Sequence, residues 1–382
     1  MRTERRTWRA PGLDITVKLW RVSWLFVLLL CALAAVGYAA LYSVAGGAPR
    51  PYADPDAMRF AAGLAMMLVV AMLDPRWLVR LAWPLYGVSL ALLVAVLRFG
   101  HVGKGAQRWI ELGGLQIQPS ELMKIALVLL LASWFRRASW ERIGNPLFLI
   151  VPVLAIVAPV VLILKEPNLG TAVITAVVGG AVMFAAGVRW WKFALVLAPL
   201  PLVAKLAYSH LHDYQQARID TFLHPESDPL GAGYNILQSK IALGSGGMWG
   251  QGYLHGTQGH LDFLPEKQTD FIFSIIGEEM GFVGAVAVMA LLCVIVLAGM
   301  VIALRCRNQF GRLLALGISV NFFMYVFVNI AMVMGAIPVG GVPLPLISHG
   351  GSAMLTVMFG FGLLMAAYVH RDAAFEDEAE EG

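Results

Sequence analysis

Residues 271–304 read FIFSIIGEEMGFVGAVAVMALLCVIVLAGMVIAL, an apolar run in which Glu278 and Glu279 are the only charged residues. A helix needs about 20 mostly apolar residues to cross the hydrocarbon core of a bilayer, and this run is longer than that. Similar runs recur throughout the 382-residue chain, of which 59% is hydrophobic and only 14% charged. Soluble domains of this size are far less apolar, so the sequence predicts a polytopic membrane protein.

The predicted fold class is all-α, with about ten transmembrane helices forming a single integral membrane domain over residues 1–382. The expected helices cover residues 22–44, 57–73, 77–99, 119–135, 146–164, 169–188, 190–208, 271–304, 312–336 and 348–369. Residues 1–21 form a basic arm and residues 371–382 an acidic tail. Because the number of helices is even, both ends of the chain are expected on one side of the membrane.

The distribution of basic residues predicts which side that is. Of the 28 Lys and Arg residues, 17 fall in the segments that share a side with the two termini. Since Lys and Arg accumulate in short cytoplasmic loops, we expect both termini in the cytoplasm. The one long polar interval, residues 209–270 between the seventh and eighth helices, is then a large extracytoplasmic loop.

Composition and motifs exclude several classes of function. In a membrane protein a net charge of +4 reflects orientation, so no nucleic-acid partner is expected. The three cysteines, Cys31, Cys293 and Cys306, suggest no disulfide framework. The chain contains neither a Gly-x-x-x-x-Gly-Lys-Ser/Thr phosphate loop nor a Gly-x-Gly-x-x-Gly fingerprint, so any energy input must come with the substrate.

Asp270 ends the long polar interval and directly precedes the apolar run of residues 271–304. A carboxylate at a membrane surface is partly desolvated, which favours proton uptake, while a polar substrate can still reach it. We therefore expect Asp270 to be a general base.

Charged residues near the outer ends of other helices are candidates for substrate contact. Glu121 and Lys124 lie three residues apart on one helix face, where they either pair only with each other or also face a substrate. Arg108 is either an interfacial anchor or a phosphate clamp. Arg59 either extends toward the lipid headgroups or contacts phosphate.

Three other stretches leave two interpretations open. The glycine-rich segment 231–259 either binds anions through backbone amides or simply permits turns. Residues 337–352 are either a plain connector or irregular backbone that lines a cavity. Gly311, Ala315 and Ser319 recur at four-residue spacing and pack either against a partner's helix or within the chain's own bundle.

Five motifs resemble, in their order along the chain, the SEDS family of peptidoglycan glycosyltransferases. They are GAQRW at 105–109, QPSE at 118–121, GSGG at 244–247, LPEKQTDFIF at 264–273 and GGS at 350–352. The resemblance covers essentially all ten predicted helices, and GTQ at 256–258 is more similar to the elongation branch of the family than to its division branch. One departure is EPNLGT at 166–171, where the family commonly has QPDLGT, so a role for an acid at this position does not carry over to Asn168.

The resemblance implies polymerisation of lipid II into glycan strands during cell elongation, in the bacterial cytoplasmic membrane, with undecaprenyl pyrophosphate as the leaving group. It makes Asp270 the catalytic residue. The expected substrate-binding residues are Arg59, Arg108, Glu121, Lys124 and Lys267. A divalent cation, Mg²⁺ or Mn²⁺, is expected to stabilise the negative charge of the departing diphosphate. The expected partner is a class B penicillin-binding protein, a transpeptidase of the elongation machinery.

The alternative function is a flippase for the same lipid-linked cell-wall precursor, because ten helices with intramembrane charges are also typical of transporters. Transporters tend to place such charges near the bilayer midplane in repeated halves of the chain. Here the charges lie toward the outer ends of the helices, and no repeat is evident. The sequence therefore favours the polymerase.

A cysteine in the long loop tests the predicted topology. In a background in which Cys31, Cys293 and Cys306 are replaced by serine, we expect Ser227→Cys to react with a membrane-impermeant thiol reagent in intact spheroplasts. The reason is that residues 209–270 are predicted to face outward. Labelling that occurs only after lysis would invert the topology.

Overall fold

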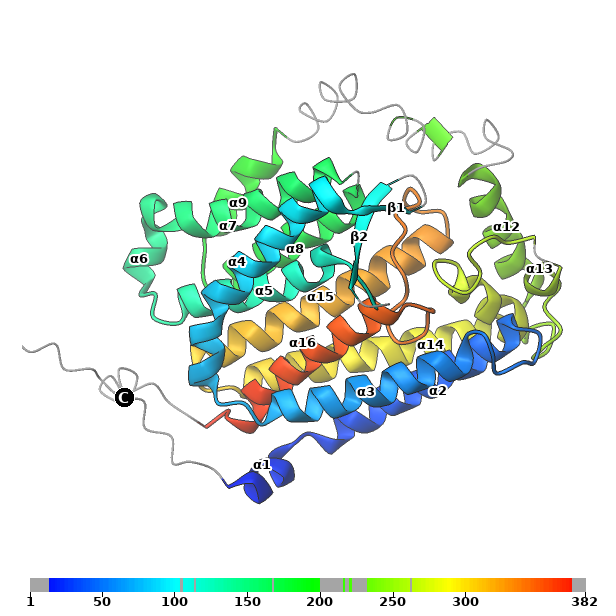
Figure 1. Cartoon of the computed structure of the whole chain (residues 1–382), viewed down its shortest axis with the longest axis horizontal. Coiled ribbons are helices and arrows are strands. Elements are labelled where there is room, and N and C mark those ends of the chain that lie inside the picture. The colour runs from blue at the N-terminus through cyan, green and yellow to red at the C-terminus, as the bar shows by residue number, and fades with distance from the viewer. Residues whose placement is uncertain are drawn as a thin grey trace, which may run out of the picture.

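The computed structural model describes residues 14–103, 106–112, 115–166, 168–199, 216, 220–221, 232–261 and 263–372. Long helices dominate this part of the chain and run side by side from one end of the molecule to the other (Figure 1). They are α1 (Ile15–Arg21), α2 (Trp24–Val44), α3 (Ala53–Ala71), α4 (Pro75–Phe99), α5 (Pro119–Phe135), α6 (Trp140–Gly144), α7 (Pro146–Lys165), α8 (Leu169–Ala185), α9 (Trp190–Leu197), α12 (Ala232–Ser245), α13 (Thr257–His260), α14 (Ile272–Arg305), α15 (Gln309–Val333) and α16 (Gly351–Val369).

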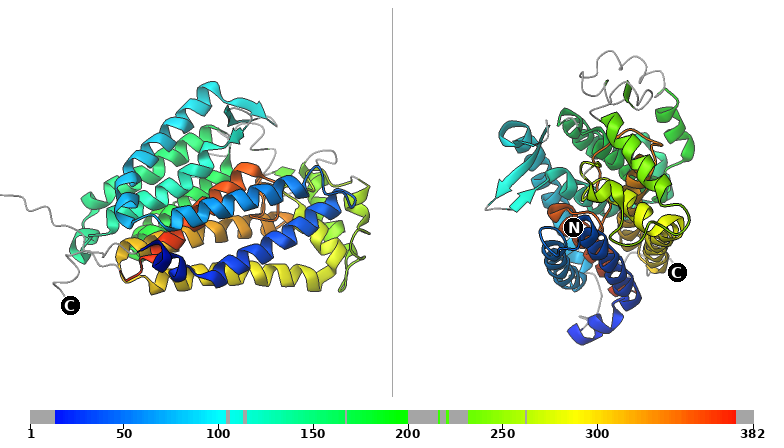
Figure 2. Two further views of the ribbon diagram at one scale, coloured as in Figure 1. Left: turned by 60° about the horizontal axis from the view of Figure 1, so that its bottom comes forward. Right: turned by 90° about the vertical axis from the view of Figure 1, so that its right-hand side faces the viewer.

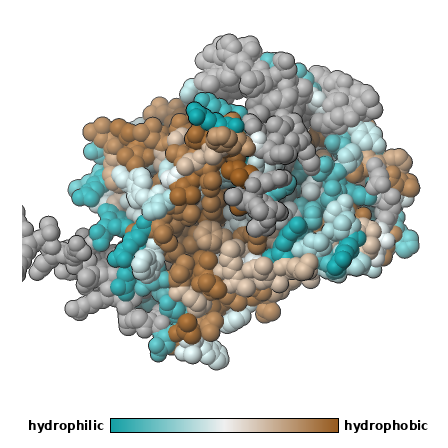
Figure 3. Space-filling view, in the orientation of Figure 1, coloured by the Kyte–Doolittle hydropathy of each residue, from teal (hydrophilic) through white to brown (hydrophobic). Residues whose placement is uncertain are grey.

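The predicted class, a polytopic α-helical membrane protein, is confirmed. A helix occupies each of the ten predicted ranges, although in the seventh range the described helix α9 covers only Trp190–Leu197. Within the described residues, six helices are long and apolar enough to cross a membrane: α2, α4, α7, α14, α15 and α16. Apolar residues occupy the middle of the face in Figure 3, and hydrophilic residues gather toward its two ends. The total number of crossings and the single-domain boundaries stay predictions.

Two groups of helices are joined by α15 and α16 (Figure 2). One group contains α4, α5, α7 and α8, and the other contains α2, α3 and α14; α15 packs against α5, α8, α14 and α16. In the most apolar 18-residue stretch of α15, 78% of the residues are buried. In the corresponding stretch of α7, at the periphery of the bundle, 28% are buried. A helix buried on all sides in a membrane protein can carry polar side chains, because its neighbours supply their hydrogen-bond partners.

A small antiparallel sheet and short helices lie where the sequence suggested only loops. Strands β1 (His101–Gly103), β2 (Ala106–Leu112) and β3 (Leu115–Ile117) pair in the order β1-β2-β3, with Ile110 opposite Ile117. The long polar interval contains α12 and α13, and α12 packs against α14 and α15. The basic arm includes α1. Strands of three to seven residues are too short to give a clear alternating pattern, which is why the sheet was not predicted.

The glycine-rich loop packs its backbone directly onto α14, where that helix is interrupted. Gly281 has φ 67° and ψ −167°, a conformation essentially restricted to glycine, and the break lies within the 34 residues of α14. A Cβ on Gly246 would lie 2.0 Å from the carbonyl oxygen of Gly277, and one on Gly250 would lie 2.0 Å from that of Glu279. At these positions glycine is needed for close approach of two backbones, which supports the turn interpretation over anion binding.

The row of small residues on α15 packs inside the bundle. Gly311, Ala315 and Ser319 are all buried, and a Cβ on Gly299 of α14 would meet the Ser319 hydroxyl at 2.3 Å. This close helix contact supports internal packing over a docking face for a partner.

The two ends of the described chain lie at the same end of the bundle. Arg21 and Asp372 form an ion pair of 3.2 Å, and the amide of Arg307 donates to the carbonyl of Arg371. This agrees with an even number of crossings.

Gly281→Ala should destabilise the fold, because alanine must adopt φ 67° and its Cβ would lie 2.3 Å from the Gly250 amide nitrogen. Backbone strain of this kind costs about 1–3 kcal/mol before the clash is counted. The measurement is thermal unfolding of the purified protein in detergent.

The matched control is Gly87→Ala in α4, where an added Cβ meets nothing within 4 Å. That variant should be neutral or up to about 1 kcal/mol more stable, because alanine favours a helix. Equal unfolding temperatures for Gly281→Ala and the wild type would contradict this account.

Candidate active site

Helix α15 joins the two regions that the sequence identified separately. The Asn329 amide nitrogen donates to the carbonyl oxygens of Asp270 and Val342, at 2.8 Å each. Four residues earlier, the Tyr325 hydroxyl donates to Glu121 and accepts a hydrogen bond from Lys124. Residues four apart share a helix face and are separated by about 6 Å of rise. The candidate base and the Glu121–Lys124 pair are therefore anchored to one face of α15.

Asp270 occupies the turn that leads into α14, and it is partly exposed. A Cβ on Gly341 would lie 3.7 Å from the Asp270 carboxylate, so the backbone of residues 340–342 passes close beside the acid. The Ser348 hydroxyl donates to the Thr269 carbonyl at 2.5 Å, and the His349 amide donates to the Gln268 carbonyl at 2.8 Å. Residues 342–349 thus form a strap that fixes the segment carrying Asp270.

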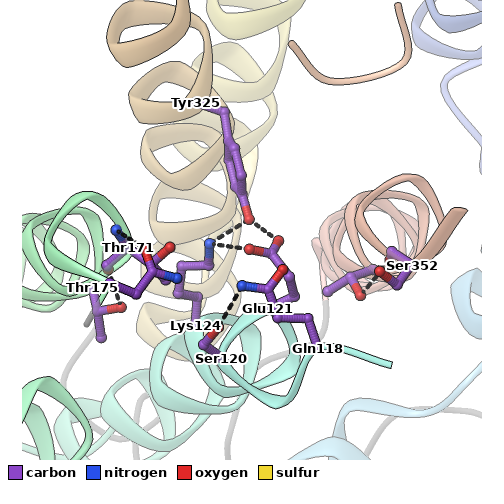
Figure 4. Close-up of polar contacts among 10 residues, drawn as sticks. Gln118, Ser120, Glu121, Lys124, Thr171, Thr175, Tyr325 and Ser352 are labelled. Atoms are coloured by element: carbon purple, nitrogen blue, oxygen red, sulfur yellow. Dashed lines mark hydrogen bonds and ion pairs between the residues drawn. The ribbon is translucent and has the colours of Figure 1, made fainter. Parts of the chain in front are cut away.

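Glu121 and Lys124 form an ion pair enclosed by the bundle. The Lys124 ammonium lies 2.8 Å from a Glu121 carboxylate oxygen and 4.1 Å from the centre of the Tyr325 ring, and the lysine side chain is 0% exposed. Figure 4 shows Thr171 and Thr175 of α8 on one side of this cluster and Ser352 of α16 on the other. A buried pair persists only when further polar groups satisfy it, and Tyr325 supplies them here. Because its side chain is fully enclosed, Lys124 can influence a substrate only as a fixed charge and not by direct contact.

The other predicted substrate-binding residues lie at separate points around this centre. Arg59 pairs with Asp56 and is 38% exposed, and a Cβ on Gly351 at the start of α16 would lie 3.1 Å from its guanidinium. The Arg108 side chain on β2 donates to the Glu166 carbonyl at 3.4 Å. Lys267 donates to the Gly259 carbonyl and so ties α13 to the segment before Asp270.

Glu166, in the turn between α7 and α8, is a buried acid close to the guanidinium of Arg108. Its side chain is 0% exposed, and neither carboxylate oxygen has a partner in the described part of the chain. Burial raises the pKa of Glu166 to about 8, and the positive charge of Arg108 opposes that rise only in part. Glu166 is therefore a neutral carboxylic acid over much of the physiological range.

Glu278 holds the start of α13 against α14, and Glu279 joins α2 to α14. Glu278 accepts hydrogen bonds from the Thr257 hydroxyl and the Gln258 amide, and Glu279 accepts one from the Ser43 hydroxyl. Among the described residues no three His, Cys, Asp or Glu side chains are grouped so that they could bind a metal ion. The cation expected from sequence stays a prediction.

Sequence reasoning missed Tyr325 and Asn329, although a signal was present. Asn321, Tyr325 and Asn329 are polar residues at four-residue spacing within an apolar helix. Polar residues in a membrane helix usually face the protein interior, so this stripe marks the inner face of α15. Asp262, an acid eight residues before Asp270, lies outside the described residues.

The family model for FtsW, RodA and SpoVE, described as a cell cycle protein, matches residues 20–373. The chain belongs to this family. It is 46% identical over 321 residues to the peptidoglycan glycosyltransferase MrdB of Escherichia coli K12, covering 82% of this chain and 84% of MrdB. It is 41% identical over 307 residues to the probable peptidoglycan glycosyltransferase FtsW of Trichlorobacter lovleyi, covering 79% of this chain and 80% of that protein.

Solved structures agree with this assignment. A chain from a study of how a peptidoglycan synthase complex coordinates polymerization and crosslinking matches with a TM-score of 0.78 and 32% identity, over 92% of this chain and 98% of that one. The rod shape determining protein RodA of Thermus thermophilus matches with a TM-score of 0.70 and 29% identity, over 92% of this chain and 98% of RodA. The protein is thus a multi-pass membrane protein and a peptidoglycan glycosyltransferase of the FtsW/RodA/SpoVE family.

The raised pKa of Glu166 predicts a specific pH dependence of stability. Between the usual value of 4.5 and the folded value of about 8, the folded protein keeps a proton that the unfolded chain has released. Stability should therefore fall as pH rises through this window, by up to about 1.4 kcal/mol per pH unit from this group. The glutamine of Glu166→Gln cannot titrate. The unfolding temperature of this variant, relative to that of the wild type, should therefore rise between pH 5.5 and pH 8.5. Parallel pH profiles of the two proteins would show that Glu166 is ionised in the fold.

Proposed function

We propose that this glycosyltransferase polymerises lipid II during cell elongation, with Asp270 as the general base. The hydroxyl oxygen of the acceptor sugar attacks the anomeric carbon of the donor, and its proton passes to the Asp270 carboxylate. The bond from the anomeric carbon to the diphosphate breaks, and its electron pair leaves with undecaprenyl pyrophosphate. This single displacement inverts the donor's anomeric configuration and needs no second carboxylate as a nucleophile.

The observation that carries this proposal is the attachment of Asp270 and of the Glu121–Lys124 pair to adjacent turns of α15 through Asn329 and Tyr325. Proton removal needs a carboxylate, and departure of a diphosphate needs positive charge nearby. α15 holds both kinds of group in a fixed relation. Preorganised charges stabilise the transition state more strongly in a partly desolvated site than water would, because they do not have to reorient during the reaction.

Positive charge for the leaving group comes from arginines at the outer ends of the helices. Arg59 is partly exposed beside the start of α16, and Arg108 lies on the small sheet next to Glu166. A guanidinium can donate two parallel hydrogen bonds to a phosphate, which suits both residues to this role. The enclosed Lys124 acts as a fixed positive charge, and its hydrogen bonds to Tyr325 and Glu121 set its position.

The site belongs on the outer face of the bacterial cytoplasmic membrane, with both termini in the cytoplasm. The charge distribution supports this orientation, as does the placement of α1 and Asp372 at the end of the bundle opposite the small sheet and α13 (Figure 1).

The partner is a class B penicillin-binding protein, the transpeptidase that crosslinks the new strands. The similarity to a chain of a peptidoglycan synthase complex in which polymerization and crosslinking are coordinated supports this pairing. The buried row of small residues on α15 is not available to such a partner, so contact must involve other helix faces.

Asp270→Asn should abolish glycan polymerisation from purified lipid II, because an amide of nearly the same shape cannot accept the proton. Loss of a general base typically lowers the rate about 10²- to 10⁴-fold. The assay measures glycan product, and a thermal unfolding curve establishes that the variant is folded.

Asp262→Asn is the matched control, since it changes an acid eight residues away that lies outside the LPEKQTDFIF motif. It should retain most of the activity. Wild-type polymerisation by Asp270→Asn would reject the proposed base. A wild type that moves lipid II across vesicle membranes without polymerising it would favour the flippase.

A further inference from the structure

Asp56, in the first turns of α3, is a buried acid that the proposed mechanism does not use. Its side chain is only 4% exposed, and it borders a cavity of about 220 Å³ whose other walls include the apolar side chains of Cys31, Phe60 and Met354. An ionised carboxylate in such surroundings must be paired, because burial of an unpaired charge is costly.

The two oxygens of Asp56 are held by two different partners. One accepts a hydrogen bond from the Arg59 guanidinium at 2.6 Å, and the other accepts one from Nδ1 of His349 at 3.1 Å. Arg59 belongs to the same helix as Asp56, whereas His349 is 293 residues away in the strap before α16. Asp56 therefore ties α3 to the strap through a single side chain.

The strap is the segment that fixes the backbone before Asp270. The amide of His349 donates to the Gln268 carbonyl at 2.8 Å, and the neighbouring Ser348 hydroxyl donates to the Thr269 carbonyl at 2.5 Å. The His349 ring also meets the ring of Tyr52 edge-on, with 5.2 Å between centroids. The contacts of the His349 ring with Asp56 and Tyr52 therefore restrain the strap at the point where its amide bonds to the segment directly preceding Asp270.

Arg59 is oriented by the same carboxylate. Gly351 leaves room for the guanidinium beside the start of α16, and the bond to Asp56 selects the direction in which it lies. Arg59 remains 38% exposed, so its remaining donors can reach a ligand at the outer surface.

We propose that Asp56 is a positioning residue of the glycosyltransferase that sets, at the same time, the direction of Arg59 and the place of the segment carrying Asp270. One carboxylate thus couples the group that binds the departing diphosphate to the group that removes the proton. This inference rests on the roles proposed for Arg59 and Asp270. Asp56 touches neither substrate nor reacting atoms, and it acts through its two partners.

The test uses the full-length protein in detergent, with purified lipid II, and measures kcat, KM and the unfolding temperature. Asp56→Asn keeps the shape but leaves one acceptor oxygen and no charge, so Arg59 and His349 cannot both be held. We expect a rise in KM from the released arginine and a fall in kcat from the loosened segment, together about 10- to 100-fold in kcat/KM. The unfolding temperature should stay within a few degrees of the wild type.

His349→Phe separates the two effects, since the ring against Tyr52 is retained and only the link to Asp56 is lost. This variant should lower kcat and leave KM unchanged. The double variant with Asp56→Asn should be no less active than Asp56→Asn alone, because both changes break the same link. Asp54→Asn is the matched control on α3: Asp54 contacts the exposed Tyr38 hydroxyl at 3.1 Å, and its loss should change neither constant.

Wild-type kcat and KM in Asp56→Asn would overturn the proposal, as would effects of Asp56→Asn and His349→Phe that multiply independently. If Asp56→Asn fails to fold, His349→Phe decides alone, and an unchanged kcat in that variant overturns the proposal. Asp270→Asn in the same assay distinguishes the two hypotheses. An active Asp270→Asn rejects the proposed function, whereas an inactive Asp270→Asn beside a fully active Asp56→Asn rejects only the positioning role.

Discussion

The two hydrogen bonds from the Asn329 amide to the carbonyls of Asp270 and Val342 determine how the end of the protein that carries Asp270 is assembled. Asp270 and Val342 lie in irregular segments between helices, where backbone carbonyls have no intrahelical donor and need another partner. A side-chain amide on a central helix satisfies two of these groups at once. The turn before α14 and the strap before α16 are thereby fixed to α15, which is itself packed against α5, α8, α12, α14 and α16.

This arrangement explains why the site is built from irregular segments. The strap of residues 342–349, residues 246–256 between α12 and α13, and the turn at Asp270 are all non-helical backbone, and side chains such as Ser348, Glu278 and Asn329 hold these segments in place. Irregular backbone near a membrane is tolerated only where the protein supplies such partners. The polar groups that permit these turns also place Asp270 where a polar substrate can reach it.

Charges in the protein are organised around the same centre in two ways. The Glu121–Lys124 pair is enclosed and completed by Tyr325, so it contributes a fixed charge distribution rather than a mobile contact. Arg59 and Arg108 are both partly exposed, and each lies beside an acid, Asp56 or Glu166. The acid beside Arg59 is an ion-pair partner, whereas the acid beside Arg108 is kept neutral by burial. Similar pairs of residues thus provide different electrostatic environments, because burial and hydrogen bonding differ.

The sequence by itself determined the membrane class, the approximate helix ranges and the candidate base, because apolar runs of about 20 residues and an acid at the end of a polar interval are local signals. Its motifs also identified the family that the comparisons confirmed. Only the tertiary structure decided that Tyr325 and Asn329 connect Glu121 to the Asp270 segment, that Gly281 interrupts α14, and that Asp56 and His349 meet across 293 residues. These contacts depend on which helices lie side by side, and that depends on packing among all of them, which no single stretch of sequence encodes.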